Sequence, residues 1–157
     1  MDFLLSLFTD FSLLMNNEII FFALVLLMVF LAEKRPEKRK KILFALLITA
    51  LLIVILKNAF AIERPCIVSP SEYGCPTPPL TSSSFPSGHA AVAFLLMIAF
   101  LDKPSFPIFW VFALLIAASR LFLGVHTFED IAGAIVLAPI AYYITDVIWR
   151  RYFERNR

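Results

Sequence analysis

A histidine and an aspartate four residues apart, His126 and Asp130, are the first pair in this sequence able to do chemistry. At the start of a helix, this spacing lets the carboxylate reach the imidazole across one turn and stabilise its positive charge. An imidazole held in this way can attack phosphorus. A buried His–Asp pair with a purely structural role fits the same spacing, as does a metal site that adds His89 and Glu129.

Three basic residues, Lys57, Arg64 and Arg120, lie within apolar runs or just beyond them. Lys57 lies inside an apolar run, where an unpaired cation costs about 2.5–3.5 kcal/mol on insertion scales, so it needs an anion. Lys57 and Arg64 are seven residues apart and project from nearly the same face if their helix continues that far. Each cation alone also fits a side chain that extends to lipid headgroups. Three together would repel a metal ion, so we predict neither a metal nor another cofactor.

The segment Phe85-Pro86-Ser87-Gly88-His89 precedes another apolar run. A proline before a helix, a serine able to cap it and a glycine that admits close approach expose backbone N–H groups at the positive end of the helix. This arrangement favours phosphate binding. Taken alone, the segment is only a turn followed by a cap.

Together these residues resemble the three signature motifs of the type 2 phosphatidic acid phosphatase superfamily. The motifs are Lys57, six residues, then Arg64-Pro65; Pro86-Ser87-Gly88-His89; and Ser119-Arg120, five residues, His126, three residues, Asp130. The resemblance covers residues 57–130. The superfamily also contains soluble acid phosphatases and vanadium haloperoxidases, but long apolar runs favour its membrane-bound lipid phosphatases.

The resemblance implies a role for each motif residue. His126 would be the nucleophile that forms a phosphohistidine, with Asp130 as its orienting partner. His89 would protonate the leaving oxygen and later act as general base toward water. The residues implied to hold the phosphate oxygens are Lys57, Arg64, Ser87, Gly88 and Arg120.

The composition places these residues in a membrane. Of 157 residues, 61% are hydrophobic and 17% charged, and the mean hydropathy is +0.85. We predict an all-α, polytopic transmembrane helical bundle that forms a single domain over residues 1–157. The about five spanning helices are predicted over residues 18–32, 42–62, 87–101, 106–123 and 128–149. The first and third are short for a bilayer.

Residues 1–16 carry apolar side chains at helical spacing over positions 3–15, with polar residues largely between them. They predict an interfacial amphipathic helix, with a short spanning segment as the alternative. Asn16 and Asn17 are candidate caps for the helix that follows. Residues 63–86 are rich in Pro, Ser and Thr and predict an extracytoplasmic loop. This loop holds Cys66 and Cys75, for which a disulfide and two free thiols are both open.

Most basic residues fall on one side of the predicted bundle, which the positive-inside rule makes the cytoplasm. They are Lys34, Arg35, Lys38, Arg39, Lys40, Lys41, Lys103, Arg150, Arg151, Arg155 and Arg157. The candidate site then lies at the opposite face of the cell membrane, toward the periplasm or exterior.

We therefore expect hydrolysis of a lipid phosphate or diphosphate within the bilayer, and no nucleic-acid partner. A polyprenyl diphosphate such as undecaprenyl diphosphate is the first candidate, because the chain is small and resembles compact family members. Phosphatidylglycerol phosphate, phosphatidic acid and a phosphorylated lipid A are alternatives. An anionic lipid-binding or transport protein is the alternative outside enzymes.

Overall fold

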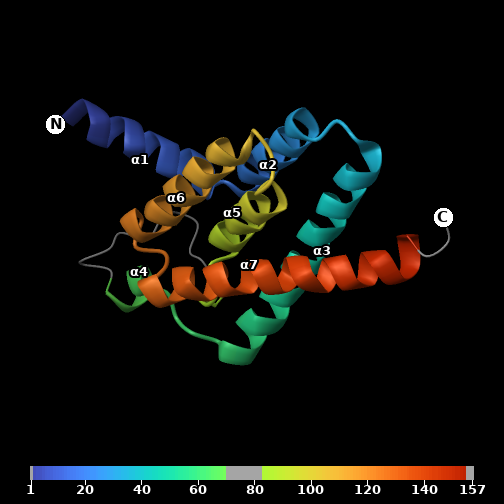
Figure 1. Ribbon diagram of the computed structural model, residues 1–157. Coiled ribbons are helices and arrows are strands. Elements are labelled where there is room, and N and C mark those ends of the chain that lie inside the picture. Colours follow the sequence, from blue (N-terminus) through green and yellow to red (C-terminus); the bar gives the residue numbers. More distant parts are fainter. Residues whose placement is uncertain (1, 70–82, 155–157) are drawn as a thin grey trace.

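The computed structural model describes residues 2–69 and 83–154, and all regular structure in this part of the chain is helical (Figure 1). The all-α prediction is confirmed. The helices are α1 (Asp2–Asn16), α2 (Glu18–Ala32), α3 (Pro36–Phe60), α4 (Pro65–Val68), α5 (Gly88–Ala99), α6 (Phe106–Phe122) and α7 (Phe128–Trp149), and a π-helical turn (Arg150–Glu154) follows α7.

The predicted bounds of α3 need correction at both ends. The helix begins at Pro36 rather than near residue 42, because proline is favoured in the first helical turn and Lys40 pairs with Glu37 one turn away. It ends at Phe60, where Ala61 takes the left-handed conformation with φ 47°. Helix α3 therefore does not continue to residue 64, and α4 forms a separate turn within the predicted loop.

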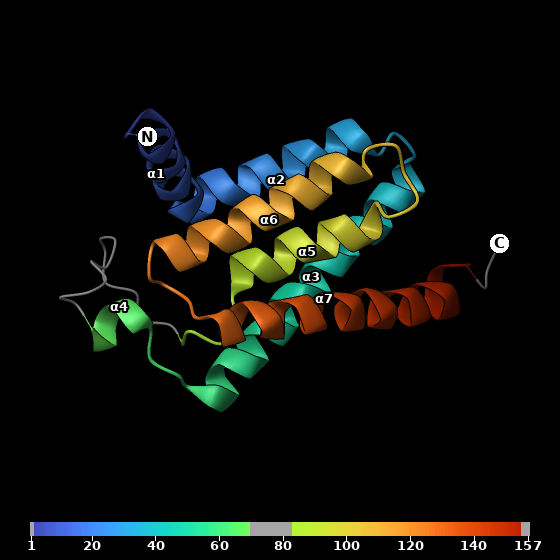
Figure 2. The same ribbon diagram turned by 60° about the vertical axis from the view of Figure 1, so that its left-hand side comes forward.

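Helix α5 lies at the centre of the bundle, between α6 on one side and α3 and α7 on the other (Figure 2). Residues 90–96 are all buried. Alanines recur on the facing surfaces, and such small side chains let helix backbones approach closely. The fully buried ones are Ala90, Ala91 and Ala93 of α5, Ala134, Ala138 and Ala141 of α7, Ala45 of α3 and Ala113 of α6.

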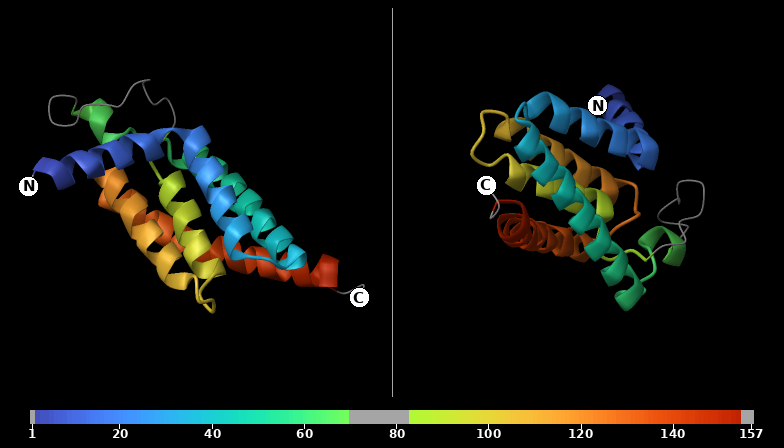
Figure 3. Two further views of the ribbon diagram at one scale, coloured as in Figure 1. Left: turned by 90° about the horizontal axis from the view of Figure 1, so that it is seen from above. Right: turned by 90° about the vertical axis from the view of Figure 1, so that its right-hand side faces the viewer.

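Helices α1 and α2 meet at an angle of 92°. Figure 3 shows α1 running across one end of the bundle while α2 descends along it. The Phe8 ring of α1 packs edge-on against Phe122 at the end of α6, with ring centroids 5.2 Å apart. Several leucines of α1 are exposed. This geometry is compatible with the predicted interfacial helix, which stays a prediction.

Within the described residues, two helical segments are long and apolar enough to cross a membrane, 36–68 and 128–153. A third is added if the bent pair α1 and α2 makes one span. Helices α5 and α6 are apolar but shorter, and the 12 residues of α5 extend about 18 Å, against a hydrocarbon core of about 30 Å. The described part of the chain thus has two to three candidate spans, and the predicted count of five is not confirmed.

Ion pairs gather at the end of the bundle where α2 and α7 finish. Glu33 pairs with Arg35 and with Lys103, and Asp146 pairs with Lys41 and Arg150. Although burial of Glu33 raises its pKa, hydrogen bonds from Arg35 and Lys103 outweigh that effect and lower it to about 2. The paired basic residues therefore lie at one end of the bundle; they are Arg35, Lys41, Lys103 and Arg150. Its assignment to the cytoplasm stays a prediction.

Candidate active site

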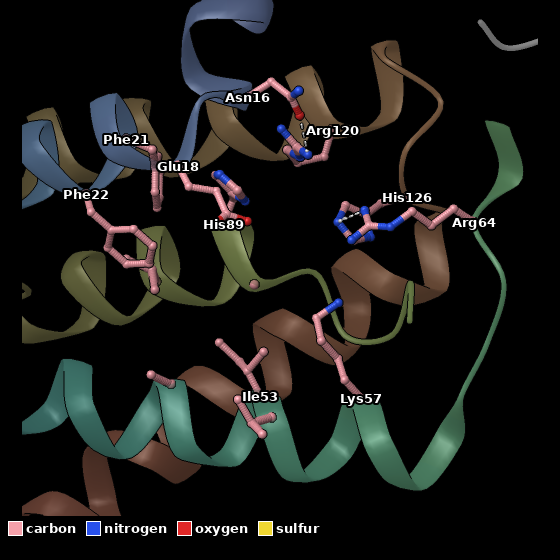
Figure 4. Close-up of a pocket in the computed structure, with 14 residues that line it drawn as sticks. Asn16, Glu18, Phe21, Phe22, Ile53, Lys57, Arg64, His89, Arg120 and His126 are labelled. Atoms are coloured by element: carbon pink, nitrogen blue, oxygen red, sulfur yellow. Dashed lines mark hydrogen bonds between the residues drawn. The ribbon is translucent and has the colours of Figure 1, made fainter. Parts of the chain in front are cut away.

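A cavity of about 210 Å³ lies at the opposite end of the bundle (Figure 4). Six of the eight predicted site residues line it: Lys57, Arg64, Gly88, His89, Arg120 and His126. Of the other two, Ser87 directly precedes Gly88, and Asp130 contacts Nδ1 of His126. The structure thus brings together cations from α3, from the start of α4 and from α6 around the imidazole of His126.

The His126–Asp130 pair is built by the start of α7. Thr127 caps this helix: its hydroxyl accepts from the backbone N–H of Asp130 at 3.3 Å, and its own N–H donates to Asp130 Oδ2 at 2.8 Å. This reciprocal capping fixes the carboxylate 3.2 Å from His126 Nδ1. The hydroxyl of Ser84 donates to the same oxygen, Oδ2.

The surroundings of His126 determine which nitrogen can react. With Asp130 accepting at Nδ1, the neutral ring carries its proton there and leaves a lone pair on Nε2. Nη1 of Arg64 lies 3.3 Å from Nε2, on the side of the cavity. Burial lowers the pKa of His126 to about 4, with the neighbouring charges of Arg64 and Arg120 acting in the same direction, although the hydrogen bond to Asp130 raises it. The imidazole is therefore neutral and nucleophilic at ordinary pH.

Each of the three cations donates to at least one neutral oxygen, and Glu18 lines the same cavity. Lys57 Nζ donates to the backbone carbonyl of Ser83, and Arg64 Nη1 donates to that of Val125 at 3.2 Å. Arg120 is 2% exposed, and its Nη2 donates to the side-chain oxygen of Asn16 at 2.9 Å. A site of this kind suits a group with two negative charges.

The start of α5 differs from the expected cap in one respect. Ser87 occupies the N-cap position, but its side chain makes no capping hydrogen bond. Within the described part of the chain, Ser87 Oγ and His89 Nε2 are buried without a hydrogen-bond partner. The His89 ring packs against Phe21, with centroids 4.3 Å apart. Both polar atoms are therefore available to a ligand.

The structure adds polar residues to the site that the sequence did not single out for it, among them Ser84, Asn16 and Glu18. Ser84 lies in a run of three serines, and nothing in that pattern distinguishes it from Ser83. Asn16 was one of two candidate caps for α2. Asn17 is the actual cap, accepting from the N–H groups of two residues that follow it, while Asn16 contacts Arg120.

Among the described residues, no group of three or more His, Cys, Asp or Glu side chains is placed to hold a metal ion. The alternative metal site, in which His89 and Glu129 would join His126 and Asp130, is therefore not formed by these side chains. Cys66 is buried and disulfide-bonded, whereas Cys75 lies outside the described residues.

Comparisons with known proteins agree with this geometry. The family profile of the PAP2 superfamily matches residues 40–157. The structure is similar to that of LpxE from Aquifex aeolicus, with a TM-score of 0.69 and 26% identity over 92% of this chain and 86% of that one. It also shares its fold with a PAP2-type phosphatidylglycerolphosphate phosphatase from Bacillus subtilis, with a TM-score of 0.65 and 20% identity over 92% and 76% of the two chains. No curated protein matches the sequence.

Proposed function

Because the chain belongs to the PAP2 superfamily, as its three motifs indicated, we propose that it is a phosphatase that acts on a membrane lipid through a phosphohistidine on His126. The observation that carries this proposal is the position of His126. Its Nδ1 lies 3.2 Å from Asp130, and its Nε2 faces a cavity lined by Lys57, Arg64 and Arg120.

The proposed reaction has two steps. In the first, Nε2 of His126 attacks phosphorus, and the bond between phosphorus and the lipid oxygen breaks. His89 donates a proton to the departing oxygen, while Asp130 stabilises the charge that develops on His126. In the second, His89 takes a proton from water, the water oxygen attacks phosphorus, and the N–P bond breaks to release inorganic phosphate.

The remaining site residues would stabilise the transferred group. In the transition state of phosphoryl transfer, negative charge is spread over the phosphoryl oxygens, and donors that are already fixed stabilise that charge without reorganising solvent. The side chains of Lys57, Arg64 and Arg120 supply positive charge, and Ser87 supplies an unpartnered hydroxyl. In this proposal Arg64 exchanges part of its contact with His126 for a phosphate oxygen.

The apolar part of the cavity supports a lipid rather than a soluble phosphate ester. Phe21 and Phe22 of α2, and Ile53 and Val54 of α3, continue the lining away from the cations. Phe22 and Val54 are also exposed on the outer surface of the bundle. A molecule with its phosphate among the cations can therefore extend an apolar chain between these two helices.

For the substrate, a polyprenyl diphosphate is our first candidate, because the chain is small and resembles compact members of the family. Phosphatidylglycerol phosphate is a second, favoured by the activity named for the Bacillus subtilis relative in fold. Phosphatidic acid and a phosphorylated lipid A complete the set. We place the protein in the cell membrane with its site toward the periplasm or exterior, following the distribution of basic residues.

The test is phosphate release by the full chain in detergent from each of these lipids, with EDTA present. Wild type should release phosphate and form an acid-labile phosphohistidine, and His126→Ala should do neither. A His126→Ala variant that keeps wild-type turnover would remove His126 from its role. Loss of activity with EDTA would support a metal. Lipid binding without turnover by wild type would support the alternative of a lipid-binding or transport protein.

A further inference from the structure

Arg120 has one described polar contact through its side chain, although it is almost completely buried. Its Nη2 donates to Asn16 Oδ1 at 2.9 Å, whereas Nε and Nη1 have no hydrogen-bond partner among the described residues. Both unpartnered nitrogens belong to a side chain that lines the cavity. A buried guanidinium with open N–H groups is costly unless a ligand completes its hydrogen bonds.

The residue that holds Arg120 comes from outside the segment that identifies the family. Asn16 is the last residue of α1, immediately before the 92° bend, and it lies 104 positions from Arg120 in the sequence. The family profile begins only at residue 40. Figure 4 shows the Asn16 side chain reaching from the end of α1 to the guanidinium.

We propose that Asn16 is a positioning residue: its amide oxygen holds one nitrogen of Arg120 so that the other two face the phosphate of the substrate. This assignment rests on the proposed function. A guanidinium is planar, so fixing Nη2 restricts the directions of the N–H bonds on Nε and Nη1 as well. Preorganised donors bind an anion without the entropy loss of ordering them at that moment.

The neutrality of Asn16 is part of this role. An amide oxygen accepts from Arg120 without adding a second carboxylate to the cavity, which Glu18 already lines, so more of the positive charge stays available to a phosphate dianion. A carboxylate at this place would accept the same hydrogen bond, because aspartate has the shape of asparagine, but it would pair with Arg120 and repel the dianion. A merely structural link between α1 and α6 would instead be kept or strengthened by a carboxylate, since a charged pair makes the stronger hydrogen bond.

Asn16→Asp therefore separates the two roles, and Asn17→Asp is its matched control. Asn17 caps α2 through its side-chain oxygen, and aspartate caps as well as asparagine does. The control adds the same charge one residue away, on an exposed residue that is not among those lining the cavity. Asn16→Ala, which removes the acceptor altogether, completes the set.

The probe is inorganic phosphate, whose affinity is measured with the full chain in detergent both by calorimetry and as an inhibition constant. We expect Asn16→Asp to weaken phosphate binding at least about tenfold while its melting temperature stays at the wild-type value or rises. Asn16→Ala should weaken binding less, and Asn17→Asp should change it by less than about threefold. Equal phosphate affinities for Asn16→Asp and Asn17→Asp would overturn the assignment.

Failure of this assignment can be told apart from failure of the proposed function. If wild type hydrolyses no lipid phosphate but binds inorganic phosphate, and Asn16→Asp weakens that binding, Asn16 keeps its role while the activity is refuted. If wild type is active and Asn16→Asp binds phosphate as well as wild type does, the positioning role alone is refuted. If wild type neither binds phosphate nor hydrolyses lipid phosphates, both are refuted.

Discussion

The carboxylate of Asp130 is the group whose contribution to turnover can be worked out most directly from the structure. Its Oδ2 accepts from His126 Nδ1, the backbone N–H of Thr127 and the hydroxyl of Ser84. In Asp130→Asn, the amide oxygen can take the place of Oδ2 and keep all three donors. The substitution then removes the negative charge with little change in packing, and the variant is expected to fold.

The loss of that charge should appear in kcat. At 3.2 Å and an effective dielectric constant of about 20, an imidazolium and a carboxylate attract each other by about 5 kcal/mol. Because the amide dipole replaces part of this attraction, a net loss of about 3 kcal/mol is reasonable for a charge-assisted hydrogen bond. The charge on His126 develops only during transfer, so kcat should fall by about two orders of magnitude while KM changes little.

The assay is phosphate release from a lipid phosphate at saturating concentration in detergent, with melting temperatures measured in parallel. Glu129→Gln is the matched control, since it removes the same charge from an exposed residue on the same helical turn and should leave kcat within about twofold. Ser84→Ala removes one hydrogen bond to the Asp130 carboxylate, worth about 1.5 kcal/mol at the low end for a charged acceptor, so kcat should fall about tenfold. If Asp130→Asn folds and keeps more than a third of wild-type kcat, the electrostatic account of this pair is refuted.

Three further predictions concern the glycine, the nucleophile and the topology. A Cβ at Gly88 would come no closer than 3.7 Å to its surroundings, so Gly88→Ala should melt at or above the wild-type temperature. The same variant should bind inorganic phosphate about tenfold more weakly than wild type does. Unchanged phosphate affinity would remove this glycine from the phosphate site. Burial lowers the pKa of His126 from 6.5 to about 4, so its ring should stay neutral at pH 5 in a 15N NMR titration assigned with His89→Asn. Because the unfolded chain then binds a proton that the folded one does not, this residue makes stability rise with pH between about 4 and 6.5, and a His126 signal that titrates near 6.5 would contradict the burial argument. An impermeant maleimide should label Phe128→Cys but not Lys40→Cys in intact cells, and the reverse pattern would invert the predicted orientation.

The local elements of the fold were readable from the sequence because hydrophobic runs and helix-ending residues are local signals. The bounds of α2, α6 and α7 follow the predicted runs within a residue or so, as each is bordered by charged, proline or glycine-containing segments. Helix α3 was missed at its start, because five charged residues in a row resemble a loop although lysine, arginine and glutamate form helices readily. The short α4 carries no periodicity and was not predicted.

The sequence by itself determined the family and the candidate chemistry, because the three motifs carry side chains whose types and spacing serve phosphoryl transfer. Only the tertiary structure decided which other groups support them. Ser84 reaches Asp130 across 46 residues, and Asn16 reaches Arg120 across 104. Contacts of this kind depend on how helices cross and bend, and side-chain direction across such distances leaves no periodic trace in the chain.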